Sequence, residues 1–221
     1  MTAPSRPGPP PRGRRAARPS GDDRQAAILA TAERLLATRP LAAVSVDDLA
    51  RGAGISRPTF YFYFRSKDAV LLALLDRVVA EADRASAAAF HGVGVPAPRR
   101  WRAVIEAYHR TFAAHRDVLV AAVELRAANP EVRATWARVT EGWVATCTAA
   151  IEAERRRGAA PPGTPARDLA VVLTSLNERV LYGTLSGERP AVAADDVVDV
   201  LLGVWLSAVY HPTDADDPAV R

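Results

Sequence analysis

At 221 residues, the chain is long enough for one compact domain or two small ones. Its single cysteine excludes an internal disulfide framework, and no apolar run approaches the roughly 20 residues of a membrane span. The N-terminal arginines precede no apolar segment of the kind found in signal peptides. We therefore expect a cytoplasmic protein with no membrane partner.

The formal net charge of +4 is concentrated at the N-terminus. Five of the 29 basic residues fall within residues 1–21, a segment without any acidic side chain. Proline, glycine and arginine dominate this segment, so it cannot bury enough apolar surface to fold alone and is predicted to be a disordered arginine-rich arm. Two interpretations stay open: the arm contacts DNA, or it is a solubilising extension.

The first predicted helix spans residues 22–38, where apolar side chains recur on one face. A second, short helix is expected after Ser45, because Asp48 three positions later can complete a capping box. Gly52 and Gly54 follow, and both are expected to supply backbone angles that other residues resist. The pattern predicts a tight turn at the end of this helix.

The third helix is predicted to begin at the cap Ser56, with Pro58 in its first turn, where a missing amide costs little. Phe60 and Phe64 lie four positions apart and are expected to anchor this helix in the core. Hydroxyl, guanidinium and ammonium groups are left at the outer face and the helix ends, where they suit phosphate oxygens and base edges. The predicted DNA-contacting residues are Ser45, Gly54, Ser56, Arg57, Thr59, Tyr61, Tyr63 and Lys67.

Two short helices joined by a glycine-bearing turn indicate a helix-turn-helix, whose second helix enters the major groove of DNA. The alternative is an ordinary αα-hairpin of a helical bundle with tyrosines on its rim. The string TFYFYFRSK, from Thr59 to Lys67, resembles the signature of TetR-family repressors. This resemblance favours DNA binding and implies a homodimer on double-stranded, palindromic operator DNA.

Helical periodicity continues through the rest of the chain. A long helix is predicted over residues 66–90, followed by helices near 99–117, 118–128, 130–157, 165–186 and 193–211. No strand pattern with hairpin turns occurs, so the predicted fold is all-α and, by the resemblance, TetR-like. The predicted organisation is an arm (1–21), a helix-turn-helix DNA-binding domain (22–67), a helical ligand-binding and dimerisation domain (68–211) and a flexible tail (212–221).

Aromatic residues recur at helical spacing in the C-terminal half, which holds all four tryptophans. Stripes of this kind are usually plain core, but here they are interleaved with polar side chains that a solid core would have to satisfy. A mostly apolar cavity with a few polar groups is the usual form of a small-molecule site, so core and cavity both stay open. The candidate ligand-binding residues are Trp101, Ile105, Tyr108, Phe112, Trp136, Thr140, Trp143, Cys147, Thr174, Asn177, Tyr182 and Trp205.

The family resemblance extends along most of the chain. In particular, the chain is similar to a TetR-family repressor of a monooxygenase gene. It implies an elongated apolar tunnel in which Asn177 makes a hydrogen bond to an ester, amide or ketone oxygen of an effector that releases the DNA. It also implies that the last two helices pair with those of a second subunit. The candidates for that interface are Val171, Leu176, Val198, Leu201, Leu202 and Val209. The same residues fit the hydrophobic core of one subunit equally well.

Two other classes of function compete with a ligand-gated repressor. One is an architectural DNA-binding protein with a solid C-terminal bundle, and the other is a carrier of lipids or small molecules. An enzyme is not expected, because the four histidines lack metal-ligand spacing and Cys147 has no evident partner base. No cofactor or metal is predicted.

Overall fold

The computed structural model describes residues 20–90 and 96–210. Within these ranges the regular elements are all helices, so the all-α prediction is confirmed. The predicted tail lies outside the described residues, as does the predicted arm apart from its last two positions. Those two positions do not belong to an arm, because Ser20 caps the first helix and Gly21 begins it.

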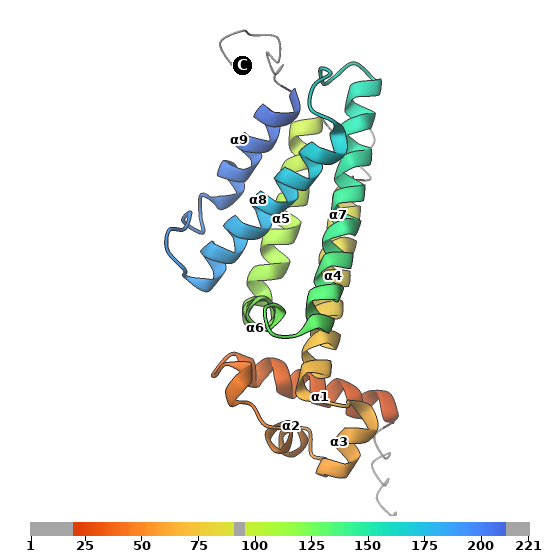
Figure 1. Cartoon of the computed structure of the whole chain (residues 1–221), viewed down its shortest axis with the longest axis vertical. Helices are drawn as coiled ribbons and strands as arrows, with labels where there is room; N and C mark the ends of the chain where they lie inside the picture. The colour runs from red at the N-terminus through yellow and green to blue at the C-terminus, as the bar shows by residue number, and fades with distance from the viewer. Residues whose placement is uncertain (1–19, 91–95, 211–221) are drawn as a thin grey trace, which may run out of the picture.

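A small head lies at one end of the molecule and a larger helical domain at the other (Figure 1). The head is built from three α-helices and one short 3-10 helix: α1 (Gly21–Leu36), η1 (Leu41–Ala43), α2 (Val46–Gly52) and α3 (Arg57–Tyr63). Ile28, Leu49 and Phe60 are at most 1 % exposed and form the centre of its core. Phe64 is also buried, which confirms the predicted anchoring of α3 by its two phenylalanines.

Each α-helix of the head starts at a serine that satisfies an otherwise free backbone amide. Ser45 Oγ accepts a hydrogen bond from Asp48 N at 3.1 Å, and Asp48 Oδ2 accepts one from Ser45 N at 3.0 Å, which is the predicted capping box. Ser56 Oγ accepts from Thr59 N at 3.3 Å. Local sequence signals therefore fix where these two helices begin.

The two glycines between α2 and α3 have different roles. Gly54 has φ of +68°, so it adopts the left-handed backbone that was predicted for the turn. For Gly52 the prediction was wrong, because it is the last residue of α2 and does not have a positive φ. A Cβ atom there would lie 2.3 Å from Thr31 Cγ2, so Gly52 is needed for the close approach of α2 to α1.

The long helix α4 (Lys67–Phe90) connects the head to the helical domain. Ser66 Oγ accepts a hydrogen bond from Ala69 N at 3.1 Å and caps the start of this helix. The ammonium group of Lys67 donates to the carbonyl oxygens of Leu41, Ala42 and Val44 at 2.8 to 3.2 Å. All three of its donors are used inside the head, so this side chain fixes α4 to η1 instead of standing free for DNA as expected.

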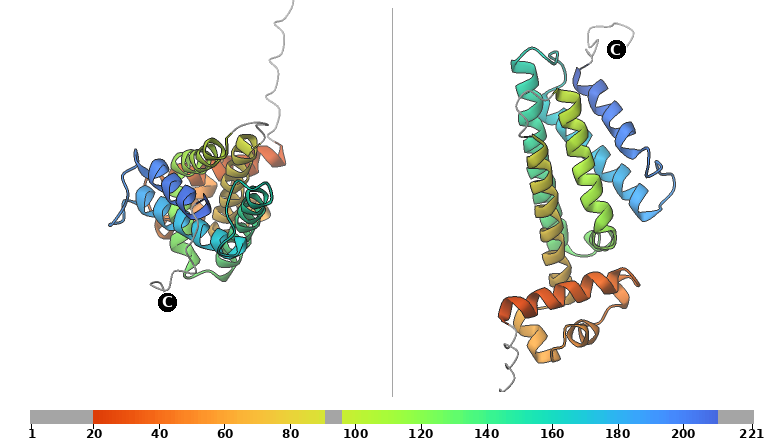
Figure 2. Two further views of the ribbon diagram at one scale, coloured as in Figure 1. Left: turned by 90° about the horizontal axis from the view of Figure 1, so that it is seen from above. Right: turned by 180° about the vertical axis from the view of Figure 1, so that it is seen from behind.

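Five further helices form the helical domain around α4: α5 (Ala97–Ala114), α6 (Arg116–Arg126), α7 (Pro130–Arg156), α8 (Ala166–Ser186) and α9 (Val197–Tyr210). In the views from behind and above, α8 and α9 lie side by side on the side of the domain away from α4 (Figure 2). The last helix begins four residues later than predicted, because residues 194–196 form a turn first. No helix in the described part of the chain is long and apolar enough to cross a bilayer.

The head and the helical domain also meet away from the base of α4. His115 lies where α5 gives way to α6, with its Nδ1 2.5 Å from Glu33 Oε1 on α1 and its Nε2 3.4 Å from Glu81 Oε2 on α4. One imidazole thus contacts the first helix of the head and the long connecting helix at once.

Candidate functional site

The outer surface of the head carries most of the predicted DNA-contacting residues. Ser56 and Arg57 at the start of α3 are exposed, as is Tyr61 one turn further along. Arg57 Nη1 donates to Asp47 Oδ2 at 3.0 Å, and its guanidinium lies 5.8 Å from the centre of the Tyr61 ring. These contacts hold the arginine against the face of the helix.

The other predicted residues of this set are placed differently. Ser45 and Thr59 have their hydroxyls in hydrogen bonds at the helix starts, and Gly54 forms the exposed turn. Tyr63 is half-buried, with its hydroxyl near Gly21 at the start of α1. Its side chain therefore faces the first helix of the head and not the open face of α3.

Sequence reasoning missed Phe62, which is 82 % exposed at the end of α3. The helical positions could have shown it, since Phe62 lies on the opposite side of α3 from Phe60 and Phe64. Together with Tyr61, which is 46 % exposed, Phe62 places two aromatic rings on the outside of α3.

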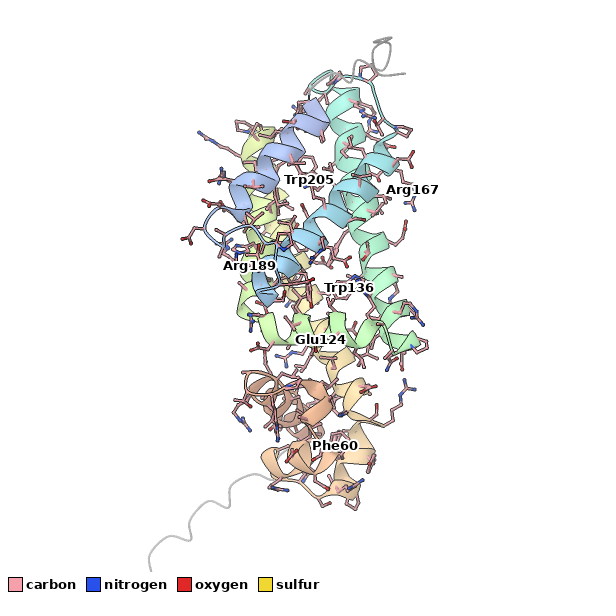
Figure 3. All side chains as sticks on the ribbon, turned by 60° about the vertical axis from the view of Figure 1, so that its left-hand side comes forward. Phe60, Glu124, Trp136, Arg167, Arg189 and Trp205 are labelled. Carbon is pink, nitrogen blue, oxygen red and sulfur yellow. The ribbon has the colours of Figure 1, made fainter. Side chains whose placement is uncertain are left out.

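The helical domain encloses a cavity with about 70 Å³ of free space. Figure 3 places Trp136 and Trp205, two of its lining residues, in this domain, above the head that contains Phe60. Eleven of the twelve candidate ligand-binding residues line it together, although they come from four different helices. The exception is Thr140, which does not line the cavity and whose buried hydroxyl has no hydrogen-bond partner among the described residues.

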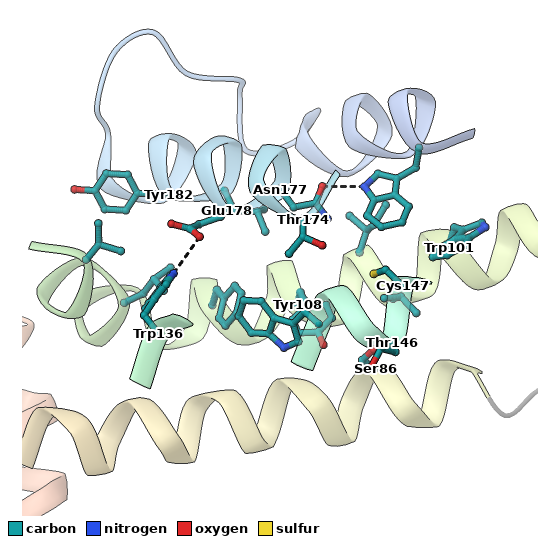
Figure 4. Close-up of a pocket in the computed structure, with 18 residues that line it drawn as sticks. Ser86, Trp101, Tyr108, Trp136, Thr146, Cys147, Thr174, Asn177, Glu178 and Tyr182 are labelled. Carbon is teal, nitrogen blue, oxygen red and sulfur yellow. Dashed lines mark hydrogen bonds between the residues drawn. The ribbon is translucent and has the colours of Figure 1, made fainter. Parts of the chain in front are cut away.

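The cavity is elongated, with Trp136 and Tyr182 near one end and Trp101 and Cys147 near the other (Figure 4). Its lining also includes residues that the aromatic periodicity did not single out: Ser86, Val104, Leu119, Val123, Thr146, Glu178 and Leu181. Most of these are small or aliphatic, and only the fold brings their helices together. Burial raises the pKa of the Cys147 thiol to about 11, so this side chain is a neutral part of the wall.

Every tryptophan of the domain donates its indole N–H to a group of the protein. Trp205 donates to Asn177 Oδ1 at 3.0 Å, and Trp136 donates to Glu178 Oε2 at 3.0 Å (Figure 4). Trp101 donates to the hydroxyl of Tyr210 at 2.9 Å, while Trp143 donates to Asp83 Oδ1 at 3.0 Å. The indoles therefore present ring surface to the cavity and no free donor.

Two polar groups of α8 face the cavity with unused hydrogen-bonding capacity. Because an indole can only donate, the bond from Trp205 fixes the amide of Asn177 with its oxygen toward that ring. No acceptor for the amide N–H groups of Asn177 is seen among the described residues. One turn earlier, the Thr174 hydroxyl is buried and has no partner with hydrogen-bond geometry; its nearest polar neighbour is the Cys147 thiol.

The one carboxylate in the lining is neutralised. Glu178 Oε1 accepts from Arg126 Nη1 at 2.6 Å, and the guanidinium of Arg126 lies 5.0 Å from the centre of the Trp136 ring. At the opposite end, buried Glu154 accepts hydrogen bonds from Arg100, Arg157 and Tyr210. The cavity wall thus carries no unpaired charge, and Glu154 is not part of it but is linked to the lining residue Trp101 through Tyr210.

Comparison with known proteins agrees with these features. A sequence model described as bacterial regulatory proteins of the tetR family matches residues 28–74, and one described as the C-terminal domain of the transcriptional regulator EthR matches residues 101–211. The chain belongs to the TetR family of DNA-binding transcriptional regulators, and it is not expected to be an enzyme. Within the family it resembles the regulator named EthR.

Two relatives and two solved structures show how far the likeness extends. The chain is 52 % identical to the HTH-type transcriptional regulator EthR of Mycobacterium tuberculosis, over 90 % of this chain and 93 % of that protein. Identity to EthR of Mycolicibacterium smegmatis is 49 %, over 90 % and 92 % of the two chains.

Among solved structures, a regulator from Saccharomonospora viridis in complex with choline has a TM-score of 0.70 at 26 % identity, covering 84 % of this chain and 96 % of that one. A TetR-family regulator from Syntrophomonas wolfei has a TM-score of 0.72 at 14 % identity, covering 88 % of this chain and 99 % of that one. The second supports the fold alone.

Proposed function

We propose that this protein represses transcription as a homodimer bound to a palindromic operator, and that a neutral, mostly apolar small molecule releases it. The observation that carries the proposal is the cavity, because its wall includes α4, the helix that carries the head. A solid C-terminal bundle, as in the architectural alternative, would have no such space.

On the DNA side, we propose that α3 enters the major groove with Ser56, Arg57, Thr59 and Tyr61 toward phosphates and base edges. Phe62 joins this set, because a ring exposed at the helix end suits contact with a thymine methyl group. One helix of seven residues reads only a few base pairs, so two heads are needed. Their half-sites would be about 34–36 Å apart.

The second subunit is proposed to pack against α8 and α9. Large apolar side chains stand exposed on these two helices at Val171, Val172, Val200 and Val204. Of the interface candidates from sequence, only Val171 belongs to this exposed set. Leu201, Leu202 and Val209 are buried inside the subunit, and Leu176 and Val198 are partly buried there. They were candidates because periodicity alone does not tell the inner face of a helix from a face that meets a partner.

The effector is proposed to be neutral, with an oxygen that accepts a hydrogen bond, as in an ester, amide or ketone. The free N–H groups of Asn177 call for an acceptor, and the Thr174 hydroxyl can donate a second bond. A charged guest would find no free counter-charge, since Glu178 is paired with Arg126. By the likeness to EthR, the regulated gene is proposed to encode a monooxygenase.

The test is a titration of the protein bound to an operator selected from a random duplex library, followed by fluorescence anisotropy. Esters and cyclic ketones of increasing chain length should stabilise the protein against heating and release the DNA in the same order. If ligands raise the melting temperature but none releases the operator, gating is wrong and a carrier role is favoured. Uniform binding to every duplex would favour the architectural alternative.

A further inference from the structure

We propose that Asp83, on α4, is the positioning residue through which the wall of the cavity controls the head. This inference rests on the proposed ligand-gated function. The hydroxyl of Tyr108 on α5 donates to Asp83 Oδ1 at 3.0 Å, and the indole N–H of Trp143 on α7 donates to the same oxygen at 3.0 Å. A single carboxylate oxygen on the long helix thus holds two side chains of the cavity wall.

Tyr108 and Trp143 form one unit of that wall. Their ring centres are 5.4 Å apart with planes at 70°, an edge-to-face arrangement, and both rings also contact Phe112. Both residues line the cavity and are only half-buried, whereas Asp83 is exposed and does not line it. The ring faces therefore meet a guest while the polar edges reach through the wall to α4.

A guest has to move part of this wall. The free space of about 70 Å³ is far below the roughly 300–1,000 Å³ of sites that hold drug-sized molecules. Trp101, Phe112, Trp136 and Trp205 are buried and closely packed, so displacing them would disrupt the core. The half-buried rings of Tyr108 and Trp143 can shift outward at lower cost, and Asp83 lies on the side toward which they would move.

Helix α4 is suited to carry this movement to the head. Asp83 and Lys67 are 16 positions apart along α4, which corresponds to about 24 Å of helix. At its base, Lys67 holds the helix to three carbonyl oxygens of the head. A displacement of α4 at Asp83 therefore becomes a rotation of the head, and hence a change in the distance between two heads of a dimer.

A second connection offers an internal comparison. His115 joins α1 and α4 directly, but it does not line the cavity, whereas Tyr108 and Trp143 do. Removing His115 would loosen the head without separating it from the cavity wall. Removing the Asp83 acceptor would remove the shared contact of Tyr108 and Trp143 with α4, while Ser86 of α4 still lines the cavity and the contacts between α4 and the head stay unchanged.

The test compares four single variants and the double variant Asp83→Ala/Tyr108→Phe in the full-length protein. Asp83→Ala removes the acceptor, Tyr108→Phe removes one donor, and Asp83→Asn keeps an acceptor oxygen while removing the charge. Asp76→Ala is the matched control, since Asp76 is another exposed aspartate of α4 and no hydrogen bond or ion pair of its side chain is seen in the described ranges. The probe is ethyl octanoate, a neutral ester, and the DNA is the library-selected operator.

Two quantities are measured: operator affinity without the probe, and the factor by which saturating probe weakens it. Asp83→Ala should lower that factor about tenfold, within the usual range of coupling between sites. It should also weaken operator binding without probe about threefold, because α4 then spends less time in the orientation that fits DNA. Tyr108→Phe should lie in between, and the double variant should lose no more than Asp83→Ala alone, since both act on one contact.

Asp83→Asn should stay close to the unmodified protein in both quantities, well inside the roughly threefold loss of operator affinity expected for Asp83→Ala, which a general loss of packing would not allow. The inference is overturned if Asp83→Ala matches Asp76→Ala in both. If ethyl octanoate and the longer esters fail to release the unmodified protein, the proposed ligand gating fails on its own. Operator affinity without probe then still decides whether Asp83 positions the head.

Discussion

The head and the helical domain are packed in different ways. In the head, each α-helix begins at a serine cap, and the core residues Ile28, Leu49 and Phe60 are almost completely inaccessible. The helical domain instead leaves free space at its centre, an unpartnered hydroxyl at Thr174 and exposed valines on α8 and α9. The core of the head is thus closely packed, whereas in the helical domain the free space, the Thr174 hydroxyl and the exposed valines coincide with proposed partners.

This difference agrees with what each part has to do. A surface that reads DNA must hold a few side chains in fixed positions, which requires a rigid frame beneath them. A domain that responds to a guest needs a region where two arrangements differ little in free energy. The following variants test this comparison, from the largest expected effect to the smallest.

The largest effect is expected for Phe60→Ala in the head. Phe60 is fully buried, so removing its ring should lower the free energy of unfolding by about 3–5 kcal/mol and abolish operator binding. Phe62→Ala is the control two positions away: it should change stability by less than about 0.5 kcal/mol while weakening operator binding. Urea unfolding measures the loss of stability of each variant, and fluorescence anisotropy measures its loss of operator binding. Equal destabilisation by both variants would contradict the described packing of α3.

The second effect concerns the exposed face of the helical domain. Val204→Arg would place a charge in the proposed twofold interface, where the partner subunit brings the same charge close to it. We expect monomers in sedimentation analysis and operator binding weakened at least about hundredfold. The control is Ala80→Arg, which adds the same charge at an exposed position of α4, on the side of the domain away from α8 and α9, and should remain dimeric. A Val204→Arg protein that is still dimeric would place the interface elsewhere.

The two parts also differ in how well the sequence predicts them. The capping box at Ser45 and the positive φ of Gly54 follow from residues within a few positions of one another. The cavity depends on how six helices, α4 to α9, face each other, and the same aromatic spacing fits a solid core equally well. The close approach at Gly52 and the internal use of Lys67 were missed for the same reason: their partners, Thr31 and η1, lie 20 or more positions earlier in the chain.

A third test concerns the buried ion pair of Glu154, which is linked through Tyr210 to Trp101 in the cavity wall. Glu154 is 4 % exposed and accepts hydrogen bonds from Arg100 and Tyr210, so Glu154→Ala leaves partly buried donors without this acceptor. We expect a loss of about 2–3 kcal/mol in the free energy of unfolding, measured with urea. The matched pair is Glu141→Ala, which breaks the exposed contact with Arg167 and should cost much less. Similar losses would mean that burial does not distinguish the two carboxylates.

The smallest expected changes in the free energy of unfolding have opposite signs in the head and in the helical domain. Gly54 has φ of +68°, so Gly54→Ala in the turn of the head should destabilise by about 1–2 kcal/mol even though a Cβ there meets no neighbouring atom. Gly142 lies within α7 and is exposed, with no atom near a Cβ, so Gly142→Ala should stabilise the protein by about 0.5–1 kcal/mol. The two substitutions add the same methyl group in open space and differ only in backbone conformation. Thermal unfolding should therefore shift in opposite directions, and a shift in the same direction for both would show that the turn tolerates other backbone angles.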